Sequence, residues 1–219
     1  MQAKSKILVI FAHPEPKSFC AAIKDTAVET LIKEGHEVKV TDLYKMKMIL
    51  PLDKTDFTTI TSPDHFKPQA EQGSCNAKNF EGYAPELKEE HEKIKWCDVM
   101  LFVFPLYWWS VPGIMKNWID RTLSMGFAYG AKGAASLKPR KGMILYTTGG
   151  PKAFHQSIGM ESVAWKLMNH GVFIFCGMTP LEPYVAYQAA WVGDAQRKTY
   201  LEEVKTAMLN IDARAEYKP

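Results

Sequence analysis

Short apolar runs alternate with segments of helical spacing along most of this 219-residue chain. The runs Ile7–Phe11 and Val99–Phe104 are continuous and apolar, which is typical of strands buried on both faces of a parallel sheet. A third segment, Val38 to Leu43, alternates apolar with polar residues and also favours a strand. With two further apolar runs, the pattern predicts five strands, over residues 7–11, 38–43, 99–104, 142–146 and 172–176.

Helical spacing separates the predicted strands. Ser18 can cap the first helix through its side-chain oxygen, and Gly35 can end it. Pro112 stands near the first turn of a later helix, a position that proline tolerates. The predicted helices cover residues 18–34, 86–96, 111–123, 161–170 and 194–213. This alternation predicts an α/β fold, with a five-stranded parallel sheet and helices on both faces in three layers.

The periodicity is lost over about 44–85, where prolines and glycines interrupt the chain. A long segment without regular structure is unusual inside a compact domain and is often functional. A linker is the alternative, but the ordered pattern on both sides favours an insertion. We therefore expect one domain over residues 1–219, with this segment as its long insertion.

Composition narrows the classes of protein. The chain is 47% hydrophobic and carries a net charge of +3 without a long basic run, so nucleic-acid binding is not implied. The apolar run Ile7–Ala12 is too short for a signal-peptide core, and no stretch reaches membrane-spanning length. The four cysteines are far apart and form no Cys-x-x-Cys pair, which suits a reducing cytosol. We expect a cytoplasmic protein without membrane insertion.

Aromatic residues follow the third predicted strand directly. Tyr107, Trp108 and Trp109 come after Pro105, where the chain leaves the sheet. Open parallel sheets bind ligands at the carboxyl ends of their strands. The aromatic run therefore suggests a wall for a flat conjugated ligand, with a flavin as the first candidate. The alternative is that these side chains belong to the core or to an interface.

Two other strand ends carry residues suited to ligands. His13 and the helix start at Ser18 follow the first strand, and amides at a helix N-terminus suit phosphate. The loop lacks the Gly-rich dinucleotide fingerprint, so a nicotinamide site of Rossmann type is not indicated. Thr147–Gly150 follows the fourth strand, where two hydroxyls and two glycines allow close approach of the backbone to a ligand. A helix cap and a plain turn are the alternatives, but three such ends on one sheet favour a shared site.

Several strings together resemble a known family. In order, they are Ala12–Phe19, Asp42–Tyr44, Phe104–Trp108, Val111–Pro112, Gly126–Tyr129, Thr147–Gly150 and Phe175–Gly177. The chain resembles the flavin-dependent NAD(P)H:quinone reductases of flavodoxin-like fold, from Ile7 to about Arg197. It is most similar to the dihydronicotinamide riboside:quinone reductase branch and its bacterial relatives.

The resemblance implies FAD in a homodimer whose active sites lie at the subunit interface. FMN is the less favoured cofactor and stays an alternative, because Cys20 replaces an asparagine of the family. It implies two-electron reduction of quinones by NADH or NADPH through a ping-pong hydride transfer. The implied cofactor-binding residues are His13, Ser18, Phe19, Cys20, Lys67, Pro105, Leu106, Tyr107, Trp108, Trp109, Thr147, Thr148, Gly149, Gly150, His155 and Arg197. The implied substrate slot consists of Trp108, Phe175 and, from the partner subunit, Phe127, Ala128 and Tyr129.

Gly149, Gly150 and His155 are the implied catalytic residues, because they would stabilise negative charge at the polar edge of the flavin. The chain departs from the family here. Cys20 replaces an asparagine, and the loop after Gly150 is about three residues shorter than in the best-known members. His155 falls near a family tyrosine that relays charge, and it either takes over that role or is a loop histidine without one.

A metal site in the riboside-dependent branch uses two histidines, of which this chain keeps His170 and has Ile174 at the other position. We therefore predict no metal site. Reduction of azo dyes or nitroaromatics at the same site is an alternative activity. A flavin-bearing regulatory subunit of a potassium-efflux system is an alternative of another class. A flavodoxin-type electron carrier is least favoured, because such carriers tend to be acidic. The sequence leaves the hydride donor open.

Overall fold

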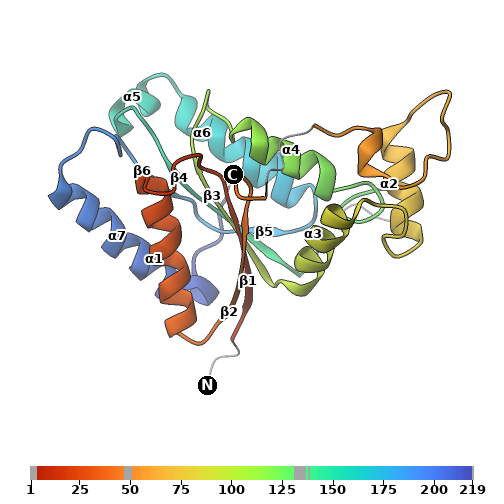
Figure 1. The fold of residues 1–219 in the computed structure, drawn as a ribbon. Coiled ribbons are helices and arrows are strands. Elements are labelled where there is room, and N and C mark those ends of the chain that lie inside the picture. The colour runs from red at the N-terminus through yellow and green to blue at the C-terminus, as the bar shows by residue number, and fades with distance from the viewer. Residues whose placement is uncertain (1–3, 47–50, 131–136, 138, 219) are drawn as a thin grey trace.

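The structure is a computed structural model that describes residues 4–46, 51–130, 137 and 139–218. A parallel sheet runs through its centre, with strands in the order β2-β1-β3-β4-β5 and with β6 also paired to β4 (Figure 1). The first four strands confirm the predicted ones to within two residues. They are β1 (Lys6–Phe11), β2 (Glu37–Asp42), β3 (Val99–Pro105) and β4 (Lys141–Thr147).

Helices cover both faces of the sheet, as predicted (Figure 1). α1 (Phe19–Lys33) and α7 (Asp194–Leu209) pack together on one face, and η3 (Ile211–Ala213) follows α7. α3 (Pro85–Trp96) and α4 (Gly113–Thr122) lie on the other. Because strand side chains alternate, the side chains of β1 enter both cores. No helix in the described ranges is long and apolar enough to cross a membrane.

The predicted fifth strand at 172–176 is wrong. Those residues lie in a helical segment in which α5 (Lys152–Ser157), α6 (Met160–Trp165) and the π-helix η2 (Lys166–Ile174) follow one another. A short apolar run does not by itself distinguish a buried strand from a buried helix. The fifth position of the sheet is filled instead by β5 (Thr179–Pro180) and β6 (Tyr184–Ala186), which pair with the two ends of β4.

The insertion is partly regular, which corrects the expectation for 44–85. It contains η1 (Lys54–Asp56) and a ten-residue helix, α2 (Pro68–Ala77), which starts at a proline. This helix is polar and includes Gly73, so its sequence gives little helical signal. A buried ion pair fixes the insertion to α4, with Arg121 Nη2 lying 2.7 Å from Asp56 Oδ1.

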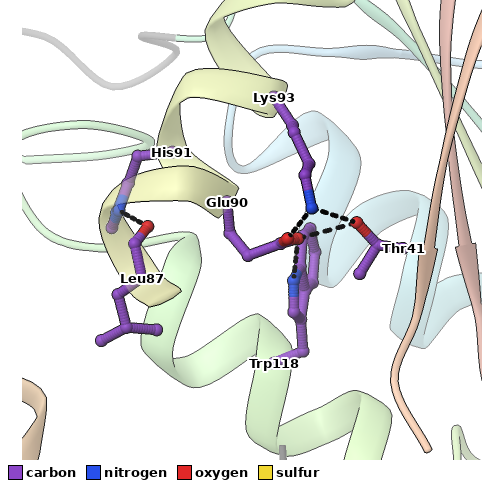
Figure 2. A network of polar contacts seen from close by, with 6 residues as sticks. All are labelled: Thr41, Leu87, Glu90, His91, Lys93 and Trp118. Carbon is purple, nitrogen blue, oxygen red and sulfur yellow. Dashed lines mark hydrogen bonds and ion pairs between the residues drawn. The ribbon is translucent and has the colours of Figure 1, made fainter. Parts of the chain in front are cut away.

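Figure 2 shows a polar network that ties α3 to β2 and α4. The Glu90 carboxylate is fully buried and accepts hydrogen bonds from Thr41 Oγ1 at 2.9 Å and from Trp118 Nε1 at 2.8 Å. Lys93 Nζ also donates to Glu90 and lies 3.5 Å from Thr41 Oγ1. A buried carboxylate needs such partners, because an unpaired one is very costly. The network therefore fixes how α3 lies on the sheet.

His91, one residue further along α3, holds the insertion against the loop after α4. Its ring is buried between Phe80 and Tyr83, with centroids at 4.7 and 4.6 Å. The Nδ1 atom lies 2.7 Å from the Leu87 carbonyl and must donate to it, which leaves Nε2 to accept from Ser124 Oγ at 3.1 Å. The Ser124 hydroxyl in turn accepts from Tyr83. A neutral imidazole thus positions residues 124–130.

Burial lowers the pKa of His91 to about 4, so the folded state binds fewer protons than the unfolded state between about pH 4 and pH 6.5. The contribution of neutral His91 to the free energy of unfolding should therefore be complete above pH 6.5. It should be reduced by about 3 kcal/mol as the pH drops to 4. His91→Phe keeps an aromatic ring and should flatten this dependence, whereas His65→Gln, at an exposed position, should not. Urea denaturation from pH 7.5 to pH 4 measures the slopes, and equal slopes for all three proteins would contradict this role.

Candidate functional site

The carboxyl ends of β1, β3, β4 and β6 lie side by side. The residue that follows each of β1, β3 and β4 donates a backbone hydrogen bond to the neighbouring strand. Ala12 N donates to Val103 O at 3.0 Å, Leu106 N donates to Thr147 O at 2.8 Å, and Thr148 N donates to Ala186 O at 3.0 Å. The three strand ends singled out from the sequence are therefore adjacent along one edge of the sheet.

A pocket of about 460 Å³ opens at the start of α1. Ser18 caps the helix by accepting from Ala21 N at 3.1 Å, as predicted. The next two amides, of Phe19 and Cys20, belong to the first turn and have no acceptor within the helix. Lys17 and Arg197 add positive charge, and no carboxylate occurs among the described residues that line the pocket. This combination suits an anionic group such as a phosphate.

His13 and Cys20 both face this pocket as uncharged groups. His13 Nδ1 accepts from Glu15 N at 3.0 Å, and burial lowers the pKa of this histidine. Burial raises the pKa of the Cys20 thiol to about 12, so the thiol stays protonated at neutral pH. Positive charge in the pocket therefore comes from Lys17, Arg197 and the helix terminus.

The aromatic segment after β3 forms a strained turn. Trp108 and Trp109 have φ values of 50° and 56°, and the flanking Tyr107 and Ser110 exchange two backbone hydrogen bonds of 3.1 and 3.0 Å. Positive φ at both central residues makes this a type I′ turn, which normally takes Asn-Gly. The turn exposes 91% of the Trp108 side chain. Left-handed backbone at bulky residues is costly and concentrates at functional sites.

A second pocket, of about 270 Å³, lies between this turn and the glycines after β4. Its lining combines Leu106, Trp108, Trp109, Thr148, Gly149, Gly150, Phe154 and His155. Thr148 Oγ1 donates to Gly150 O at 2.8 Å and fixes the glycine turn. The space beside Gly149 is open, because a Cβ there would meet no atom within 4 Å. His155 is 6% exposed, and its Nε2 atom would lie 3.1 Å from a Cβ on Gly150.

Apart from Trp108, the residues expected in the substrate slot lie elsewhere in this chain. Tyr129 and Phe175 pair at 5.4 Å and line a third pocket, of about 350 Å³, together with residues of the insertion and α4. Phe127 packs against Phe80 and His91, and the Ala128 side chain is fully buried. The chain therefore keeps this group apart from the Trp108 pocket.

Three of the predicted cofactor-binding residues line none of these pockets. Pro105 is buried at the end of β3, and Tyr107 is half-exposed in the turn. Lys67 precedes α2, which Figure 1 shows on the side of the molecule away from α7 and the start of α1. Lys17 and Phe154 also line the two pockets and were not predicted. Both stand directly beside predicted residues, Ser18 and His155, so their position in the motifs could have indicated them.

The residues present fit a flavin on two observations. The indole Nε1 of Trp109, which lines this pocket, is buried without a hydrogen-bond partner in the described chain, so a donor there lacks an acceptor. The open space at Gly149 would be filled by the Cβ of any other residue. An aromatic and glycine-lined pocket beside an anion-suited one matches a ring system that carries a phosphate.

Comparison with known proteins supports this reading of the fold. A family model described as flavodoxin-like fold matches residues 5–210. A ribosyldihydronicotinamide dehydrogenase [quinone] of Rattus norvegicus is 35% identical over 207 residues, covering 91% of this chain and 88% of that protein. An NAD(P)H dehydrogenase [quinone] 1 of Cavia porcellus is also 35% identical, covering 96% of this chain and 78% of that protein.

Solved structures share the architecture. A Klebsiella pneumoniae protein assigned as a quinone reductase superimposes with a TM-score of 0.90 at 27% identity, covering 97% of this chain and 87% of that one. An NAD(P)H:quinone oxidoreductase from Methanothermobacter marburgensis has a TM-score of 0.81 at 23% identity, covering 96% and 98%. The sheet order, the motifs at its carboxyl edge and these relatives agree, and the chain belongs to the NAD(P)H dehydrogenase (quinone) family of flavodoxin-like fold.

Proposed function

We propose that this protein binds FAD and catalyses the two-electron reduction of quinones by a reduced nicotinamide, in ping-pong fashion. The observation that carries the proposal is the adjacency of two complementary pockets along one edge of the sheet. One is positively charged at a helix N-terminus, and the other is aromatic and lined by glycines. A bound flavin supplies the hydride chemistry, and the protein supplies position and electrostatics.

The residues of the two pockets would have different roles in binding the flavin and the substrate. Lys17, Arg197 and the start of α1 bind the phosphates. Trp108 forms a wall for the ring system and the substrate. The Gly149 and Gly150 amides have no protein acceptor in the described structure and can donate to the polar edge of a ligand. Because burial lowers its pKa, His155 is neutral before reduction and can accept positive charge next to that edge.

A homodimer would complete the site. Large apolar side chains are exposed along the helical segment that runs from α5 to the residue after η2. They are Phe154, Ile158, Val163, Leu167, Ile174 and Phe175. Such a patch is typical of an interface. It adjoins the Trp108 pocket through Phe154 and the Tyr129 pocket through Phe175. A second copy of this chain docked on this patch would bring the partner subunit's Tyr129 and Phe175 toward Trp108. We therefore favour a second copy as the partner that covers the patch.

The activity is tested by anaerobic stopped-flow reduction of the purified protein. NADH, NADPH and a dihydronicotinamide riboside are each mixed with it, and the flavin absorbance near ~450 nm is followed before a quinone is added. We expect rapid bleaching by at least one donor and rapid reoxidation by the quinone. If an azo dye reoxidises the reduced flavin faster than any quinone does, the alternative azoreductase activity is assigned. A flavin that no donor reduces would refute the proposal.

Two variants of Trp108 test whether its ring contacts the flavin and the substrate. Trp108→Ala should raise the flavin dissociation constant about tenfold, which corresponds to about 1.4 kcal/mol of lost ring contact. Trp108→Phe keeps a flat ring and should retain most of the affinity. Unchanged affinity and turnover in the alanine variant would remove Trp108 from the site.

The dimer is tested with two leucines of similar exposure. Leu167 on η2 is 49% exposed, and Leu209 at the end of α7 is 55% exposed on the other side of the sheet. Leu167→Glu would bury a charge at the proposed interface and should give monomers with little turnover. Leu209→Glu should remain dimeric and active. Light scattering after gel filtration reports the mass, and a monomeric wild-type protein or a dimeric Leu167→Glu variant would contradict this interface.

A further inference from the structure

His155 occupies an unusual place for a histidine. It lies in α5, which is the short helix after the glycine turn, and its side chain is buried while both ring nitrogens lack a protein hydrogen-bond partner in the described structure. The Nε2 atom lies beside the Gly150 backbone. Neither nitrogen is among the fully buried unpaired polar atoms of the described residues, so both reach accessible space. The ring nitrogens are therefore available to a molecule in the Trp108 pocket.

Tyr187 lies next to the ring, and Glu161 lies next to Tyr187. The Tyr187 ring, which follows β6, meets the His155 ring edge-on, with centroids 5.9 Å apart and planes at 62°. The Tyr187 hydroxyl donates to Glu161 Oε1, because burial and the adjacent carboxylate raise the pKa of this tyrosine and keep it protonated. Gln156 Nε2 donates to the other oxygen, Glu161 Oε2, at 3.3 Å. The carboxylate is therefore held in place from two sides.

Glu161 is the charged group that acts on His155. Burial lowers the pKa of His155, and the Glu161 carboxylate partly offsets this by favouring the cation. From the elements packed around the ring, the titratable groups that face it are Glu161 on α6 and Tyr187 after β6. On its own helix, Lys152 lies one turn earlier and is exposed. The Glu161 carboxylate thus favours positive charge on the ring, and Tyr187 holds this carboxylate through its hydroxyl.

We propose that Glu161 and Tyr187 are positioning residues for His155, which hold its ring against the Gly149–Gly150 turn and set how readily it becomes positively charged. The role of His155 in the reaction rests on the proposed function, whereas the effect of Glu161 and Tyr187 on His155 does not. By taking up one proton from solvent, the imidazole gains the charge that opposes negative charge at the polar edge of a bound ring system. Glu161 stabilises this cation, and the Tyr187 hydroxyl keeps Glu161 where it can do so.

The test measures the pKa of His155 by NMR titration of the histidine ring signals in the purified flavin-bound protein. His155→Gln assigns the signal by its disappearance. Glu161→Gln keeps an acceptor for Tyr187 but removes the charge, and it should lower the pKa of His155 by about half a unit to one unit. Glu161→Asp keeps the charge and should retain most of the wild-type pKa. Glu92→Gln, at an exposed position on α3, is the control and should leave the pKa unchanged.

The second readout is the pH profile of flavin reduction by the best donor. In Glu161→Gln the limb that reports His155 should move to lower pH by the same amount as the pKa in the NMR titration. An unchanged pKa in this variant overturns the pairing, and a shifted pKa with an unmoved profile overturns its part in the reaction. If no donor reduces the wild-type flavin, the proposed function fails, while the NMR titration still decides the pairing.

Discussion

The site depends on the in-register parallel pairing of β1, β3 and β4. Phe11 pairs with Val103, and Pro105 pairs with Thr147, so these strands end within a residue or two of one another. Three candidate groups follow these ends, namely the start of α1, the aromatic turn and the glycine turn, and Arg197 is added from α7. A slip of one residue in any pair would turn apolar side chains to the wrong face and separate the ligand groups. The same apolar core therefore stabilises the fold and sets the geometry of the site.

The Trp108–Trp109 turn costs stability, and the proposed ligand site gives a reason for it. Two bulky residues in the left-handed region cost of order 1–3 kcal/mol each. The two hydrogen bonds between Tyr107 and Ser110, together with the rigid strand before them, hold the turn in this conformation. A glycine would relieve the strain but would remove a ring from the pocket wall. Indole rings at these positions are therefore best explained by a ligand.

The sequence predicted the fold where the apolar pattern and the local chemistry agree. Ser18 caps α1 as its residue type suggests, and the first four strands lie where the buried runs place them. The prediction failed at 172–176, where an apolar run is helical and its exposed Ile174 and Phe175 belong to a surface patch. The Glu161–Tyr187 pair could not be predicted either, because it joins residues 26 positions apart across a strand, β6, that gives no recognisable pattern.

The central claim is that these strand ends form one flavin site. The most direct test is to denature the purified protein, separate the released chromophore from the chain, and identify and count it by chromatography. We expect one FAD for each chain. FMN at the same ratio would correct the cofactor but keep the site, whereas a chain that holds no flavin, even after incubation with FAD, would contradict a flavin site at these strand ends.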